Sequence, residues 1–150
     1  MKTSFVRTGL RFTGLLVLSA TLARAAAPVV FDFAGAPADV QAENANVTAT
    51  TTPEGVKQLE LSFTGGQEYP GVRFVMASPR DLSAYTGVEV ELTNTGGESC
   101  KVGLRVDNEG DWQTEPWNSE VDMIAPGETK TIAVTFGQSY GVPGFKLDAS

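Results

Sequence analysis

The chain has 150 residues, 41% of them hydrophobic, with no histidine and a net charge of −7 at pH 7. Its length predicts one domain, and the lack of histidine excludes Ser-His-Asp triads, Cys-His pairs and His-ligated metal sites. The acidic balance makes nucleic acids and anionic membrane surfaces poor partners, because their phosphate groups repel a negatively charged domain.

Residues 1–25 have the pattern of a secretory signal peptide. Three basic residues precede an apolar run over 13–22, and a small-x-small cleavage site ends at Ala25. The apolar run is short for a bilayer span, which disfavours the alternative of an uncleaved N-terminal anchor. We therefore expect the leader to be removed.

Cleavage after Ala25, or after Ala27 as the alternative, would leave residues 26–150 as the mature domain. Four of the 11 basic residues and none of the 18 acidic ones lie in the leader, so 7 basic and 18 acidic residues remain and the net charge becomes −11. We therefore expect a secreted or periplasmic bacterial protein. A net charge of this sign does not disfavour an uncharged glycan as its partner.

The mature sequence alternates apolar and polar residues in short stretches, the pattern of strands with one buried face. These stretches lie at 28–33, near Val47, and at 56–64, 71–77, 88–93, 101–107, 119–124 and 129–136. We expect one helical turn over 81–85, a type II turn over 125–128 and a loop over 137–150. The spacing predicts an all-β fold, an antiparallel β-sandwich.

The two strands that flank residues 94–99 are the most regular. Their connection is rich in turn formers and predicts a β-hairpin. Across such a hairpin, Arg105 would pair with Glu89 or Glu91, since opposite charges on facing strands attract each other.

Cys100 is the only cysteine, so an exported form of the chain has no internal disulfide. Its core must then hold by burial of apolar side chains, alone or with a bound ion. Because Cys100 begins a strand, we expect a buried small residue rather than a reactive thiol.

The order of several segments resembles a known family. The leader is followed by VVFDF (29–33), YPGVRF (69–74), SPRDLSAYTGVEVELTNTG (78–96), VGLRVDN (102–108), APGETKTIAVTF (125–136) and GFKLDAS (144–150). This order is similar to the N-terminal carbohydrate-binding-like module of family-50 glycoside hydrolases, the β-agarases. The most specific segments are Asp-Leu-Ser-x-Tyr-x-Gly with Asn94-Thr95-Gly96, and the strand end Arg105-Val-Asp-Asn; none is a catalytic motif.

The resemblance implies a jelly-roll, galactose-binding-like sandwich and a polysaccharide ligand, such as an agarose-like galactan. In that family one more strand pair and the catalytic domain follow the segment that resembles GFKLDAS. The resemblance therefore implies that residues 1–150 stop inside the module and are non-catalytic by themselves.

A polar loop carries the candidate glycan-binding residues. An indole ring can cover the apolar C–H face of a sugar while carboxylates and amides bond its hydroxyl groups. The candidate carbohydrate-binding residues are Trp112, Trp117, Asp107, Asn108 and Glu115, with Tyr69 as an extension of the platform. The alternative is that the tryptophan rings fold back and cover the end of the core.

Two other roles for acidic residues remain open. A cluster of carboxylates around the tryptophans has the composition of a glycosidase pair, although a solvated acidic loop explains it more simply. Asp32 is a candidate ligand for a structural calcium ion, because calcium takes carboxylate and carbonyl oxygens. The sequence thus favours a non-catalytic polysaccharide-binding module, with a purely structural spacer domain as the alternative.

Overall fold

The computed structural model describes residues 3–8, 14–19, 40–63, 66, 68–75, 81–108, 113 and 116–148. Every regular element in these ranges is a β-strand, which confirms the all-β prediction. The strands are β1 (Thr3–Thr8), β2 (Gly14–Ser19), β3 (Val40–Glu43), β4 (Ala45–Thr51), β5 (Lys57–Phe63), β6 (Gly71–Val75), β7 (Gly87–Asn94), β8 (Cys100–Asp107), β9 (Trp117–Ile124), β10 (Thr129–Thr135), β11 (Gln138–Ser139) and β12 (Val142–Pro143). No helix among the described residues is long and apolar enough to cross a membrane.

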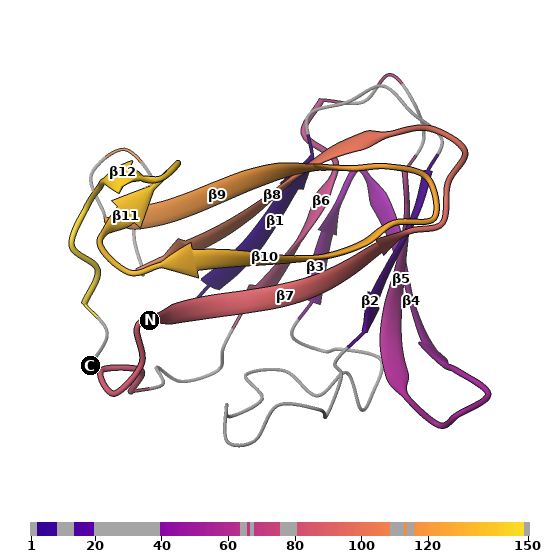
Figure 1. Ribbon diagram of the computed structural model, residues 1–150, viewed down its shortest axis with the longest axis horizontal. Helices are drawn as coiled ribbons and strands as arrows, with labels where there is room; N and C mark the ends of the chain where they lie inside the picture. Colours follow the sequence, from indigo (N-terminus) through magenta and orange to yellow (C-terminus); the bar gives the residue numbers. More distant parts are fainter. Residues whose placement is uncertain are drawn as a thin grey trace.

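Ten of these strands form two five-stranded sheets, and all their pairings are antiparallel (Figure 1). Sheet A has the order β3-β6-β1-β8-β9, and sheet B has the order β10-β7-β2-β5-β4. The short strands β11 and β12 pair only with each other among the described strands and form a ribbon. Most predicted strands are present. Successive strands pair in β4–β5, β8–β9 and β11–β12, and the other pairings join strands that are not successive in the sequence.

The expected leader supplies one inner strand to each sheet. In sheet A, β1 lies between β6 and β8, and in sheet B, β2 lies between β5 and β7. The structure is that of the unprocessed chain, and cleavage after Ala25 stays a prediction. The strand predicted at 28–33 lies outside the described residues.

The predicted hairpin between β7 and β8 is wrong, because these strands belong to different sheets. The side chain of Asn94, which is 1% exposed, organises the connection between them. Its amide nitrogen donates to the carbonyl oxygens of Glu98 (2.8 Å) and Ile124 (2.9 Å), and its oxygen accepts the Gly96 N–H (2.9 Å). The turn-forming residues 94–99 therefore connect the two sheets here. The same residue types also form hairpin turns, so the local sequence does not distinguish the two structures.

Two predicted turns have different outcomes. In the turn over 125–128, Gly127 has φ 75° and the Glu128 N–H donates to the Ala125 carbonyl (3.0 Å), which agrees with the predicted type II turn. Over 81–85 there is a turn but no helix. There the Asp81 carboxylate accepts the Ser83 N–H (2.9 Å) in place of a helical bond.

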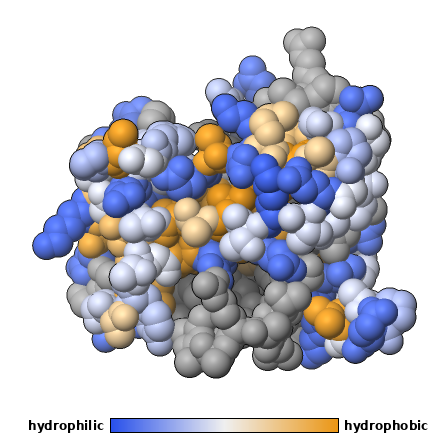
Figure 2. Space-filling view, in the orientation of Figure 1, coloured by the Kyte–Doolittle hydropathy of each residue, from blue (hydrophilic) through white to orange (hydrophobic). Residues whose placement is uncertain are grey.

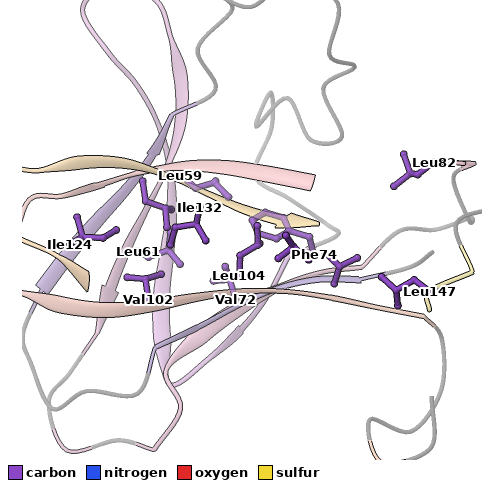
Figure 3. Close-up of a cluster of buried hydrophobic side chains, with 13 residues drawn as sticks. Leu59, Leu61, Val72, Phe74, Leu82, Val102, Leu104, Ile124, Ile132 and Leu147 are labelled. Carbon is purple, nitrogen blue, oxygen red and sulfur yellow. The ribbon is translucent and has the colours of Figure 1, made fainter. Parts of the chain in front are cut away.

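Residues from both sheets form one buried core (Figure 3). Its members are Leu59, Leu61, Val72, Phe74, Leu82, Leu92, Val102, Leu104, Val106, Ile124, Ile132, Val134 and Leu147. Most of these residues were predicted to point inward from the alternation of apolar and polar residues. Val88, Val90 and Phe136, which alternate with polar residues in the predicted strands, are partly buried against this core.

Cys100 is partly buried, and its sulfur lies 3.9 Å from the Ile124 carbonyl oxygen. Burial raises the pKa of the Cys100 thiol, which lowers the fraction of reactive thiolate. We expect iodoacetamide at pH 8 to alkylate the native chain several-fold more slowly than the chain unfolded in urea, as followed by mass spectrometry. Equal rates in the two states would show that the thiol is not protected.

Candidate functional site

Three of the predicted site residues lie outside the described residues: Trp112, Glu115 and Asp32. The geometry of the site is therefore built from Trp117, Asp107, Asn108 and Tyr69, together with the side chains that contact them.

Strands β8 and β9 bring Asp107 and Trp117 together as register partners on the outer side of sheet A. Arg105 lies two residues before Asp107 and so on the same face. Its guanidinium carbon lies 4.8 Å from the centre of the Trp117 ring. Its Nε donates to Asp107 Oδ1 at 2.7 Å, and its Nη2 donates to the same oxygen. The predicted pairing of Arg105 with Glu89 or Glu91 is wrong, because both glutamates lie on β7 in the other sheet.

The ribbon of β11 and β12 brings Phe145 beside Trp117, with ring centroids 5.9 Å apart and planes inclined at 60°. Phe145 is 54% exposed. The ribbon turns at Tyr140 and Gly141, whose φ angles of 54° and 74° are those of a type I′ turn. This segment was predicted to be a loop, because Tyr-Gly is a much weaker hairpin signal than Asn-Gly or Asp-Gly.

Asn118 attaches the ribbon to β9. Its side chain is fully buried, donates to the Phe145 carbonyl (2.9 Å) and accepts the Gly137 N–H (2.8 Å). The Tyr140 N–H adds a bond to the Ser119 carbonyl (2.8 Å). Asn118 is not among the predicted site residues, because the sequence does not show that it bonds the backbone of an exposed aromatic residue.

Asn108 acts as an anchor for the end of the described chain. Its side-chain nitrogen donates to the Asp148 carbonyl (3.0 Å), and its side-chain oxygen accepts the Asp148 N–H (3.1 Å). One side-chain N–H of Asn108 remains in addition to these two bonds. The predicted ligand-bonding role of Asn108 would rest on that donor and on the second lone pair of its side-chain oxygen.

Tyr69 does not join the other predicted site residues. It is 51% exposed and has φ 50° in the turn before β6. Gly71, the first residue of β6, and Gly103 of β8 both pair with residue 7 of β1. Trp117 pairs with Asp107, which is the last residue of β8. Tyr69 and Trp117 therefore lie toward opposite ends of sheet A.

We call the group of Arg105, Asp107, Trp117 and Phe145 the aromatic platform. The platform combines an exposed phenyl ring, a partly buried indole ring and an ion pair at one end of sheet A. Val142 of the ribbon is a further exposed hydrophobic residue, at 59%. Figure 2 shows hydrophobic residues along the middle of one face of the molecule, between hydrophilic ones. Such a surface can cover an apolar ligand face while charged groups bond the polar rim of the ligand.

Acidic side chains near the platform make contacts within the protein. The described residues include no group of three or more His, Cys, Asp or Glu side chains that could hold a metal ion. Of the acidic residues around the tryptophans, Asp107 is paired with Arg105, and Glu120 accepts the Gly141 N–H at 2.7 Å. Both carboxylates thus have structural contacts within sheet A and the ribbon.

Comparisons of the chain with protein-family models, with curated proteins and with solved structures find no match. The resemblance to β-agarase modules stays a prediction from the sequence motifs quoted above.

Proposed function

We propose that this chain is a non-catalytic polysaccharide-binding module of a secreted, agarase-like glycoside hydrolase. In this proposal the two sheets form a jelly-roll sandwich of the galactose-binding-like type. The shared core of the two antiparallel five-stranded sheets supports that fold. The acidic net charge supports a neutral galactan over nucleic acid or membrane as the partner. The leader supports secretion, or export to the periplasm.

The observation that carries the binding proposal is the exposed Phe145 ring held beside Trp117. Sugar rings present apolar C–H faces surrounded by hydroxyl groups, and aromatic rings at a surface match that chemistry. Asp107 can accept bonds from hydroxyl groups at the edge of the platform. Trp112 and Glu115, which lie outside the described residues, are further predicted binding residues in this proposal.

Replacement of the two platform rings tests this proposal. We expect Trp117→Ala with Phe145→Ala to abolish retardation in agarose affinity electrophoresis, because both stacking surfaces are lost. Phe145→Ala alone should weaken retardation and change the free energy of unfolding by less than about 0.5 kcal/mol, since its ring is exposed. Unchanged retardation of the double variant would remove the platform as the binding site.

The alternative function is a structural spacer that packs against a catalytic domain. Val121 and Met123, which are 39% and 47% exposed on β9, favour it, because they lie two residues apart on the outer face of sheet A. The matched control is Val121→Ala with Met123→Ala. This control should leave retardation unchanged if the platform binds the glycan. No retardation of the unsubstituted chain would favour the spacer, since a domain that only packs against its neighbour binds no glycan.

A third function, glycoside hydrolysis by the acidic loop, would require reducing-sugar release by the purified chain. We expect no release above a control in which Glu115→Gln and Asp107→Asn are combined.

A further inference from the structure

Strand β4 presents an open edge at one side of sheet B. Among the described strands its one neighbour is β5, so the backbone N–H and C=O groups that β4 directs away from β5 face no further strand there. The strand reads Ala-Asn-Val-Thr-Ala-Thr-Thr over Ala45–Thr51 and contains no charged residue, proline or glycine. Strand edges of this kind are templates for pairing with another extended segment.

The other three edges of the two sheets have features that disfavour such pairing. Strand β3 is only four residues long and ends at Glu43. The ribbon covers the edge of β9, because the Tyr140 N–H donates to the Ser119 carbonyl (2.8 Å). Strand β10 carries Lys130, whose amino group lies 3.1 Å from the Asp122 carboxylate. Short length, cover and charge each protect an edge, so β4 is the unprotected one among the described strands.

The two faces of β4 follow from its register with β5. Val47 and Ala49 pair with fully buried leucines of β5, so both residues lie on the core face of the sheet. The residues that alternate with them lie on the outer face: Asn46, Thr48 and Thr50. Both faces of the strand are therefore uncharged.

The sequence of β4 is self-complementary when two copies run antiparallel. Residues directly opposite each other share a face, and a register with Thr48 opposite itself pairs all seven residues of the strand. On the outer face Asn46 then lies opposite Thr50 of the second copy. On the core face Val47 lies opposite Ala49 of the second copy. Uncharged pairs of β-branched and hydrogen-bonding residues such as these stabilise adjacent strands.

We propose that β4 pairs with β4 of a second copy of this chain, antiparallel and about a two-fold axis through Thr48. The pairing joins two five-stranded B sheets into one continuous sheet. Charge supports this site, because two chains of net charge −7 repel each other and an edge without charged side chains lets them approach. A two-fold contact uses the same surface on both chains, so assembly stops at the dimer.

A buried hydroxyl group supports the same register. Thr50 Oγ1 is buried and has no hydrogen-bond partner, a state that lowers stability. In the paired edge the amide group of Asn46 from the second copy lies opposite Thr50, and rotation about χ1 would direct the hydroxyl toward it. Pairing would thus give this group a hydrogen-bond partner.

Pairing through β4 leaves the aromatic platform accessible. Strand β4 lies at the right of Figure 1, and the ribbon beside the platform lies at the left. A dimer would therefore carry two platforms, and two sites on one polysaccharide chain would strengthen its retention. That consequence rests on the proposed function. The pairing itself does not, and it is measured without any glycan.

Sedimentation equilibrium of the full 150-residue chain tests the pairing. We expect a monomer–dimer equilibrium. Thr48→Glu should raise the dimer dissociation constant by about tenfold or more, because two new carboxylates meet at the axis, each opposite Glu60 of its own chain. The matched control is Thr131→Glu on β10, which is exposed, lies on the other edge strand of sheet B and is opposite Glu91. It should change the constant by less than about twofold.

Cysteine cross-linking in a Cys100→Ala background tests the register. With copper phenanthroline as oxidant, Thr48→Cys should form a disulfide-linked dimer, because residues opposite each other on antiparallel strands have Cα atoms about 4.5–5.5 Å apart. Asn46→Cys should form none, because the two copies of residue 46 would lie roughly 14 Å apart along the strands. Far-UV circular dichroism checks that each variant is folded.

Four results would overturn the proposal. The first is a chain that stays monomeric at its highest soluble concentration, and the second is a dimer that Thr48→Glu does not weaken. The third is equal cross-linking through residues 46 and 48. The fourth is growth into open-ended assemblies, since a two-fold contact closes at two copies.

Discussion

Asn118→Ala is expected to lower the free energy of unfolding by about 2–4 kcal/mol, because a buried group left without its partner costs about 1–3 kcal/mol. The truncation leaves the Phe145 carbonyl and the Gly137 N–H without their side-chain partner. Urea denaturation monitored by tryptophan fluorescence measures the loss. The matched control is Asn46→Ala on β4, where the side chain is exposed and the change should stay within about 0.5 kcal/mol.

The same substitution links stability to the proposed binding site. Asn118 bonds the backbone of Phe145, so its loss should displace the ring from Trp117 and weaken retardation in agarose. This effect should appear in conditions where the variant is still folded, as judged by its far-UV circular dichroism. A stability loss of the expected size with normal retardation would show that Phe145 does not contribute to binding.

The positions of β4 to β10 could be predicted from the sequence, but their partners could not. Alternation placed Leu59, Leu61, Val102 and Leu104 on inner faces, because a strand with one buried face repeats every two residues. Alternation does not state which strand lies alongside. The connection at Asn94 shows why: the same turn-forming residues can close a hairpin or cross between sheets, and here a contact with Ile124, 30 residues away, decides the outcome.

The candidate site was predictable only in part. Trp117 and Asp107 were both named from their chemistry, and the structure makes them neighbours. The pairing of Arg105 with Asp107 could have been predicted, since residues two apart on a strand share a face. Phe145 carried no local signal, because its position depends on the ribbon and on Asn118.

Asn94→Ala is the second large effect that we expect, again about 2–4 kcal/mol of unfolding free energy, by the same cost of unsatisfied buried groups. Three side-chain bonds are lost, to Glu98, Ile124 and Gly96. The measurement is the urea midpoint at constant slope, with Ser99→Ala in the exposed part of the same connection as the control.

Asn94→Asp tests the hydrogen bonds of the side chain without changing its shape. The aspartate keeps the oxygen that accepts the Gly96 N–H but loses both donors, and its burial raises its pKa in the folded state. The folded state then binds a proton more readily than the unfolded state, so this variant should recover part of its deficit relative to the wild type as the pH falls through that raised pKa. A deficit below about 1 kcal/mol for Asn94→Ala would mean that the backbone bonds between Asn94 and the turn at Gly127 and Glu128 hold the crossing without the side chain.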